Sequence, residues 1–187
     1  MNVDLDLITA CVNRERKAEY ELYKMTYSYL MSISFRYVNS GERAREMVNI
    51  GFLKILRNLK KYRPEVPFKT WIRKVMINIL IDEFRKEKKH IENLNYVENY
   101  KESSSYSEVN NAVTKMNVEQ IHALVQQLPP VSQQVFNLFV IDGYGHKEIA
   151  GMLDMSEGTS KWHLNFSRNK LKEMMEQIGF THKNVMQ

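Results

Sequence analysis

Apolar residues recur at steps of three or four along most of this 187-residue chain, which is the pattern of amphipathic helices. The clearest stripe runs through Leu22, Met25, Tyr29, Ile33 and Tyr37. With only 7 glycines and 4 prolines, the chain has few of the turn residues that an all-β fold requires. The pattern therefore predicts an all-α protein.

The helical pattern fades in one internal stretch, from about His90 to Val113. Residues 103–105 are three serines among Asn, Glu and Tyr, a composition typical of a linker. We therefore expect two small helical domains and a flexible linker, with the domains at 1–90 and 116–187 and the linker at 91–115.

Composition excludes several classes of protein. At 43% hydrophobic and 26% charged residues, the chain can bury a core and is not a disordered sequence. No apolar run approaches the roughly 18 residues of a membrane span, and the N-terminus lacks the pattern of a signal peptide. The single Cys11 excludes an internal disulfide and is expected to be a small buried residue. We expect a cytoplasmic protein without membrane insertion.

The net charge of +5 is concentrated in one block of the sequence. Residues 54–89 carry twelve basic and four acidic side chains, whereas residues 90–120 carry two basic and five acidic ones. Clustered Lys and Arg attract phosphates, and interleaved aromatic residues offer flat faces to unstacked bases. Most charge runs are solvated helix faces, but this concentration favours a nucleic-acid partner.

The C-terminal part carries the pattern of a helix-turn-helix, over His146–Ser156 and Glu157–Leu171. Ser156 is placed to cap the second helix. The inner sides of the two helices are predicted to hold Ile149, Ala150, Leu153, Ser160, Leu164, Ser167 and Leu171. The residues expected to face the bases are Thr159, Lys161, Trp162, Asn165, Phe166 and Arg168. A plain helical hairpin shares the periodicity, but the cap and the short turn favour DNA binding.

No motif for catalysis or cofactor binding is present in the sequence. The five histidines are scattered singly, and we find no metal-spaced His/Cys cluster, glycine-rich phosphate loop or nucleophile motif. We therefore expect no enzymatic activity, no metal and no cofactor.

Several stretches carry a family resemblance when they are taken together. They are Tyr62-Arg-Pro with Pro67-Phe68 and Thr70-Trp71-Ile72; Asn78 with Ile81-Asp82 and Arg85; Leu128-Pro-Pro130; Val135-Phe136; and Glu148-Ile-Ala with Leu153 and Met155-Ser-Glu-Gly-Thr159. Over about residues 15–180 the chain resembles the extracytoplasmic-function (ECF, group 4) sigma factors of bacterial RNA polymerase, in the sigma-70 family.

The resemblance implies a specificity subunit whose partners are promoter DNA and the polymerase core, at the clamp helices of β′ and the β flap. An anti-sigma factor or a recruiting protein is a further expected class of partner. Polymerase binding is implied for Arg45, Glu46, Asn49 and Phe52. Opening of the minus-10 element around a flipped base is implied for Lys54, Asn58, Tyr62 and Asn78, with Asp82 and Arg85 on the same helix face. The second helix of the helix-turn-helix would enter the minus-35 major groove.

The chain departs from the family pattern at three places. In the turn of the helix-turn-helix, Asp154 stands where the family usually has glycine. The usually acidic clamp-binding helix reads Asn49-Ile50 followed by a mid-helix Gly51, which costs up to about 1 kcal/mol relative to Ala. The recognition helix holds one arginine, Arg168, and its Trp162 and Phe166 form an aromatic ridge. Two interpretations stay open: a different minus-35 sequence read through thymine methyls and through Asn165 on adenine, or a ridge that docks a recruiting protein.

A stand-alone, dimeric helix-turn-helix regulator is the alternative function. It explains the C-terminal domain but gives residues 62–85 no role. Binding to polymerase core separates the two hypotheses.

Overall fold

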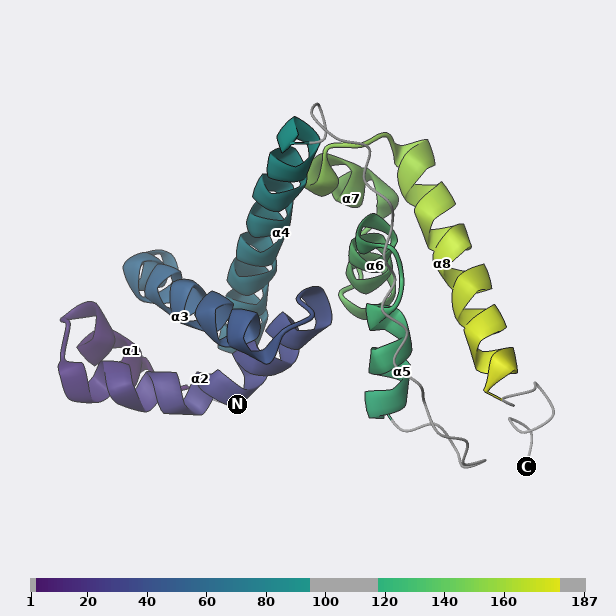
Figure 1. The fold of residues 1–187 in the computed structure, drawn as a ribbon. Coiled ribbons are helices and arrows are strands. Elements are labelled where there is room, and N and C mark those ends of the chain that lie inside the picture. The colour runs from purple at the N-terminus through teal and green to yellow at the C-terminus, as the bar shows by residue number, and fades with distance from the viewer. Residues whose placement is uncertain (1–2, 95–117, 179–187) are drawn as a thin grey trace. The chain divides into compact units, whose positions relative to one another are not determined.

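The computed structural model describes residues 3–94 and 118–178. The chain divides into two compact units, Met1–Arg85 and Lys86–Gln187, and the boundary falls inside helix α4 (Phe68–Leu94). The regular structure of the described ranges is entirely helical, which confirms the predicted all-α class (Figure 1). Of the predicted linker, residues 91–94 continue α4 and residues 95–115 lie outside the described ranges.

The first unit contains α1 (Leu5–Val12), α2 (Arg16–Tyr37), α3 (Gly41–Asn58), the short 3-10 turn η1 (Leu59–Lys61) and the start of α4. Ser40 caps the N-terminus of helix α3, because its hydroxyl accepts a hydrogen bond from Arg43 N at 3.2 Å. Helix α1 has no counterpart in the predicted stripes, since two turns are too short to show a periodicity.

Aliphatic side chains from α2, α3 and α4 form the core of the first unit. The fully buried ones include Leu22, Leu30, Ile33, Met47, Val48, Ile55, Ile72, Met76 and Ile77. Two buried hydroxyls are satisfied within α2, because Thr26 donates to Leu22 O at 2.8 Å and Ser34 donates to Leu30 O at 2.9 Å. Met25 was expected in this stripe but is 40% exposed.

Gly51 on α3 packs tightly against side chains of α4. A β-carbon at this buried position would lie 2.5 Å from Met76 Sδ on α4. The mid-helix glycine therefore makes room for a neighbouring helix, a reason that local sequence does not reveal.

The second unit contains α5 (Val118–Gln126), α6 (Pro130–Phe136), the π-helical turn η2 (Asn137–Ile141), α7 (His146–Leu153) and α8 (Glu157–Gln177). Its core holds Leu124, Val125, Leu128, Val135, Leu138, Ile149, Leu153 and Leu164. Ser160 and Ser167 are buried on the inner side of α8, as the spacing predicts, whereas Ala150 and Leu171 are half-buried.

The turn of the helix-turn-helix is held by its backbone and by a cap. Asp154 adopts the left-handed conformation, with φ 55° and ψ 54°, at the position where the family usually has glycine. The Ser156 hydroxyl accepts a hydrogen bond from Thr159 N at 3.0 Å, which confirms the predicted cap. Gly145 N donates to the Glu148 carboxylate at 2.9 Å and so fixes the start of α7.

Cys11 is 3% exposed on α1, as expected for a small buried residue. Burial, together with the nearby carboxylates of Glu19, Glu15 and Glu21, raises the pKa of the thiol to about 11, so it stays protonated at neutral pH. Among the helices that the structure describes, none is both long enough and apolar enough to span a bilayer.

Candidate nucleic-acid interface

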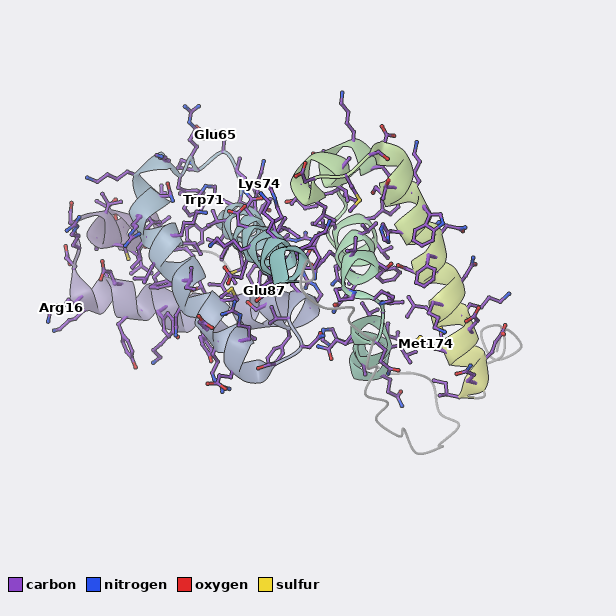
Figure 2. The ribbon with its side chains drawn as sticks, turned by 45° about the horizontal axis from the view of Figure 1, so that its top comes forward. Arg16, Glu65, Trp71, Lys74, Glu87 and Met174 are labelled. Carbon is purple, nitrogen blue, oxygen red and sulfur yellow. The ribbon has the colours of Figure 1, made fainter. Side chains whose placement is uncertain are left out.

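Basic side chains surround the loop that connects α3 to α4. The exposed members of this group are Lys54, Arg57, Lys60, Lys61, Arg63, Lys69 and Lys74. Figure 2 labels Glu65 on the loop itself and Trp71 and Lys74 on the helix that follows it. These cations are exposed and lie close together along the chain, so they concentrate positive charge beside the loop.

Three aromatic rings hold this loop in one conformation. The Tyr62 ring centroid lies 5.2 Å from that of Phe68 and 5.4 Å from that of Trp71. The Tyr62 hydroxyl donates to Val66 O at 2.9 Å and so ties the loop across its own span. Phe68 is 5% exposed and serves as the anchor, whereas Tyr62 and Trp71 are half-buried and keep part of their rings accessible.

One face of α4 continues from this aromatic cluster. Trp71, Asn78, Asp82 and Arg85 follow one another at steps of seven, four and three residues, so they lie along one side of the helix. Asn78 and Asp82 are exposed and Arg85 is half-buried. The structure therefore places three of the predicted minus-10 residues and Trp71 on a continuous strip.

Lys54 and Asn58 lie at the end of α3, and the structure connects Lys54 to the strip on α4. Lys54 Nζ lies 3.8 Å from a carboxylate oxygen of Asp82, although both side chains are about half exposed. Asn58 donates to Lys54 O at 2.8 Å and satisfies a carbonyl in the last turn of α3. An exposed ion pair of this kind stabilises the fold little, and both groups stay accessible to solvent.

The predicted polymerase-binding residues of α3 fall into two groups. Arg45, Glu46 and Asn49 are exposed; Glu46 pairs with Arg43 at 2.6 Å, and Asn49 accepts a hydrogen bond from the Tyr23 hydroxyl at 3.0 Å. Phe52 differs from them because it is 8% exposed, with its ring 5.0 Å from that of Tyr23. The structure thus places Phe52 in the core of the unit rather than on its surface.

Two exposed apolar residues of α3 were missing from the predicted set. Ile50 is 43% exposed and Leu53 is 54% exposed. Both lie off the buried stripe of α3. Together with Glu46 and Asn49, which precede them by a few residues, they line one outer face of the helix. The sequence could have identified Ile50 and Leu53, because they are apolar residues that lie outside the buried stripe of their helix.

The predicted recognition helix presents its expected face to solvent. Thr159, Lys161, Trp162, Asn165 and Arg168 are exposed, whereas Phe166 is half-buried. The Trp162 and Phe166 rings stack at a centroid distance of 5.4 Å and an angle of 16°. Lys161 Nζ lies 2.9 Å from a Glu157 carboxylate oxygen, and this contact lowers the pKa of Glu157.

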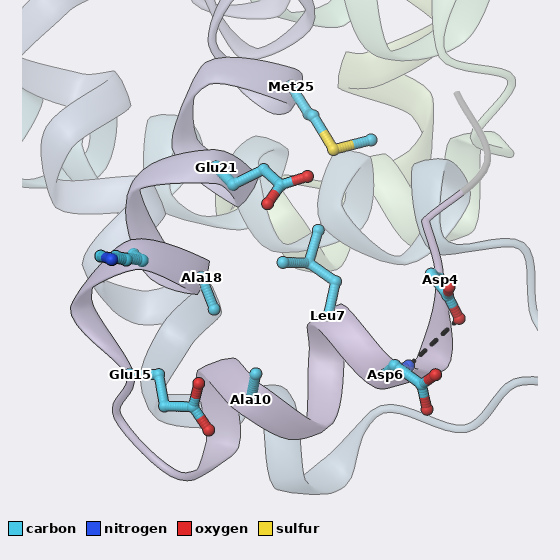
Figure 3. A pocket seen from close by; sticks show the side chains of 9 residues that line it. Asp4, Asp6, Leu7, Ala10, Glu15, Ala18, Glu21 and Met25 are labelled. Atoms are coloured by element: carbon cyan, nitrogen blue, oxygen red, sulfur yellow. Dashed lines mark hydrogen bonds between the residues drawn. The ribbon is translucent and has the colours of Figure 1, made fainter.

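An open hollow between α1 and α2 has the opposite electrostatic character (Figure 3). Its lining includes the carboxylates of Asp4, Asp6, Glu15 and Glu21 and one lysine, Lys17. The Asp4 carboxylate accepts a hydrogen bond from Asp6 N at 3.2 Å and caps α1. This excess of negative charge disfavours phosphate, so the hollow does not extend the nucleic-acid interface.

Within residues 3–94 and 118–178, no group of three or more His, Cys, Asp or Glu side chains is arranged to hold a metal ion. Burial lowers the pKa of His163, whose Nδ1 lies 2.9 Å from the Ser132 hydroxyl. His146 Nδ1 lies at the same distance from the Ser160 hydroxyl. Both rings therefore take part in packing α8 against its own unit.

Residues 22–90 match the family Sigma-70 region 2, and residues 118–171 match Sigma-70, region 4. Over 184 residues the chain is 23% identical to the ECF RNA polymerase sigma-E factor of Escherichia coli K12, covering 94% of this chain and 95% of that protein. It is 20% identical over 138 residues to the ECF RNA polymerase sigma factor EcfG of Rhodopseudomonas palustris, covering 73% of each.

A similar fold is found in the sigma factor RpoE from Bartonella quintana, solved in complex with the anti-sigma factor NepR. The two chains superpose with a TM-score of 0.52 at 15% identity, over 84% of this chain and 96% of that one.

Proposed function

Because the chain belongs to the sigma-70 family as an extracytoplasmic-function sigma factor, it directs promoter-specific initiation by RNA polymerase, and we propose which of its residues do so. The observation that supports the assignment most strongly is the strip from Tyr62 and Trp71 to Arg85, beside the basic loop. This strip combines phosphate-binding charge, accessible ring faces and hydrogen-bonding side chains, which are the groups needed to hold a separated DNA strand.

The strip on α4 opens the minus-10 element. Lysines and arginines of the 54–74 segment bind the backbone phosphates, while Asn78 and Tyr62 contact the edge and face of a flipped non-template base. Extruding a base costs a few kcal/mol, and these contacts offset that cost. Asp82 and Arg85 extend the contact along the helix, and Lys54 exchanges its contact with Asp82 for a phosphate.

The outer face of α3 binds the polymerase core. Glu46, Asn49 and Arg45 supply polar contacts there, and Ile50 with Leu53 supplies apolar area in the place of the family's usual acidic residues. The buried Phe52 supports this face from beneath by its contact with Tyr23.

Helix α8 lies at the minus-35 element, with its outer residues facing the major groove. The chain acts in the cytoplasm, where the polymerase works, and it contributes specificity rather than catalysis. An anti-sigma factor that covers these surfaces is a natural partner, since a related fold was solved with one.

The assignment of Asn78 is tested with 2-aminopurine placed in turn at each non-template position of a minus-10 element. Holoenzyme carrying the parent chain is expected to raise the fluorescence at the flipped position. Asn78→Ala should reduce open-complex yield about tenfold by loss of a hydrogen bond to the base, with core affinity unchanged. Ser28→Ala, an exposed substitution on α2, is the control and should match the parent. Unaltered base flipping by Asn78→Ala and by Tyr62→Ala would remove both residues from the proposed site.

A further inference from the structure

Trp162 and Phe166 form a ridge on α8 that is fixed from several sides. Trp162 is 59% exposed, yet its ring stacks on Phe166 and meets the edge of His163 at a centroid distance of 4.9 Å. His163 in turn lies 2.9 Å from the Ser132 hydroxyl on α6 through its Nδ1. Two neighbouring rings of the same helix thus contact and support the large exposed ring.

The polar groups beside the ridge differ in their availability. Asn165 is exposed, and its side chain makes no hydrogen bond to any residue in the described part of the chain. Lys161 is engaged with Glu157, and the Arg168 guanidinium lies 6.0 Å from the centre of the Phe139 ring. The Lys161–Glu157 pair is exposed and stabilises little, so it does not withhold Lys161 from DNA. The choice against guanine rests instead on residues 162–166, which include no Arg or Lys to make the bidentate contact.

We propose that α8 reads A·T pairs, and not guanine, at the base pairs beneath residues 162–166. Asn165 binds the N6 and N7 edge of adenine, and the Trp162–Phe166 ridge packs against the C5-methyl groups of neighbouring thymines. The proposal deepens the assigned function, on which it rests, by naming the class of minus-35 sequence that the chain selects.

The surroundings of the ridge favour DNA over a protein as its occupant. Trp162 is the only large apolar side chain of α8 that is strongly exposed among the described residues, so the apolar area is narrow. Thr159, Lys161, Asn165 and Arg168 border it with polar and basic groups. A protein-docking surface has a broader desolvated centre, whereas a narrow apolar ridge between polar groups suits methyl groups in a major groove.

The test uses holoenzyme assembled with the full chain and a duplex promoter library randomised upstream of the minus-10 element. We expect the selected minus-35 block to contain adenine and thymine, without guanine, at the positions that depend on residues 162–166. Each selected thymine is then replaced by uracil, which keeps the base pair and removes only the methyl group. At the thymines beneath the ridge, affinity should fall about fourfold per methyl.

Protein variants assign the contacts within this block. Trp162→Ala should abolish the uracil effect, and Asn165→Ala should relax the choice of base at one adenine and weaken binding there about tenfold. Lys172→Ala, an exposed change farther along α8, should leave the preference unaltered. None of these side chains belongs to the core, so the variants are expected to fold.

Selection of guanine beneath residues 162–166, or full tolerance of uracil, would overturn the proposal. Initiation without any minus-35 preference would also overturn it and point to a recruiting protein on the ridge. A wrong sigma-factor assignment would give a different result, because no member of the library would then support initiation.

Discussion

At the scale of the residue, Gly51 leaves room on α3 for the Met76 side chain of α4. A β-carbon at this position would lie 2.5 Å from Met76 Sδ, and Met76 is itself fully buried. Gly151 on α7 is the opposite case, because a β-carbon there would contact nothing within 4 Å. The two helical glycines therefore separate the effect of packing from the effect of helix propensity.

We expect Gly51→Ala to destabilise the first unit by about 1–3 kcal/mol, since overpacking outweighs the gain in helix propensity. Gly151→Ala should instead stabilise the second unit by up to about 1 kcal/mol. Denaturant unfolding monitored by tryptophan fluorescence measures each unit separately, with Trp162→Phe leaving Trp71 in the first and Trp71→Phe leaving Trp162 in the second. An unchanged or more stable Gly51→Ala protein would contradict the close approach.

At the scale of the element, helix α8 carries a half-buried histidine, His163, whose protonation opposes folding. Burial lowers the pKa of His163 in the folded unit, whereas the unfolded chain keeps a value of about 6.5. The unfolded state therefore binds the proton more readily, and the stability of the second unit decreases as the pH falls from about 6.5 toward the lower pKa of the folded state.

Amide hydrogen exchange in α6 and α8 between pH 7.5 and 5.5 measures this effect. Protection, corrected for intrinsic exchange rates, should decrease toward low pH in the parent, and His163→Gln should flatten that dependence. An identical slope in the two proteins would show that another group is responsible.

The outer face of α3 provides a prediction with a closely matched control. Leu53 and Leu5 are both 54% exposed in the first unit, but only Leu53 lies on the proposed polymerase-binding face. Leu53→Ala should weaken binding to polymerase core about tenfold through the lost apolar burial. Leu5→Ala should leave it unchanged, as measured by competition with a labelled parent chain. Equal affinities for the two variants would place the core contact elsewhere.

Sequence periodicity predicted those elements that have long stripes and clear boundaries. The Ser156 cap and the inner positions Ser160 and Leu164 of α8 follow from local rules and are confirmed. The short helix α1 and the π-helical turn η2 leave no periodicity in the sequence by which they could be predicted. The role of Gly51 depends on Met76, far along the chain, so no local rule could reveal it.

The candidate site was predictable to a similar extent. Sequence spacing places Asn78, Asp82 and Arg85 on one helix face, as the structure shows. It does not show that Phe52 packs on Tyr23, nor that Ile50 and Leu53 are exposed, because burial depends on which helix covers each position. The roles of these residues toward DNA and polymerase remain predictions.

At the scale of the whole molecule, the distribution of charge matches a division of labour between the two units. Residues 54–85 of the first unit carry nine basic and three acidic side chains, whereas residues 121–187 of the second carry equal numbers of acidic and basic side chains. Salt-dependent affinity for DNA should therefore arise mainly in the first unit, and base-specific contacts by α8 should add selectivity with little further charge.

The most direct measurement is run-off transcription from a promoter library by purified polymerase core of the native host, with and without this chain. We predict initiation that depends on the chain, at defined start sites preceded by one shared minus-10 motif and an upstream A/T block. Failure to bind the core and to initiate on any template, with DNA binding retained, would contradict the sigma-factor assignment and favour a stand-alone regulator.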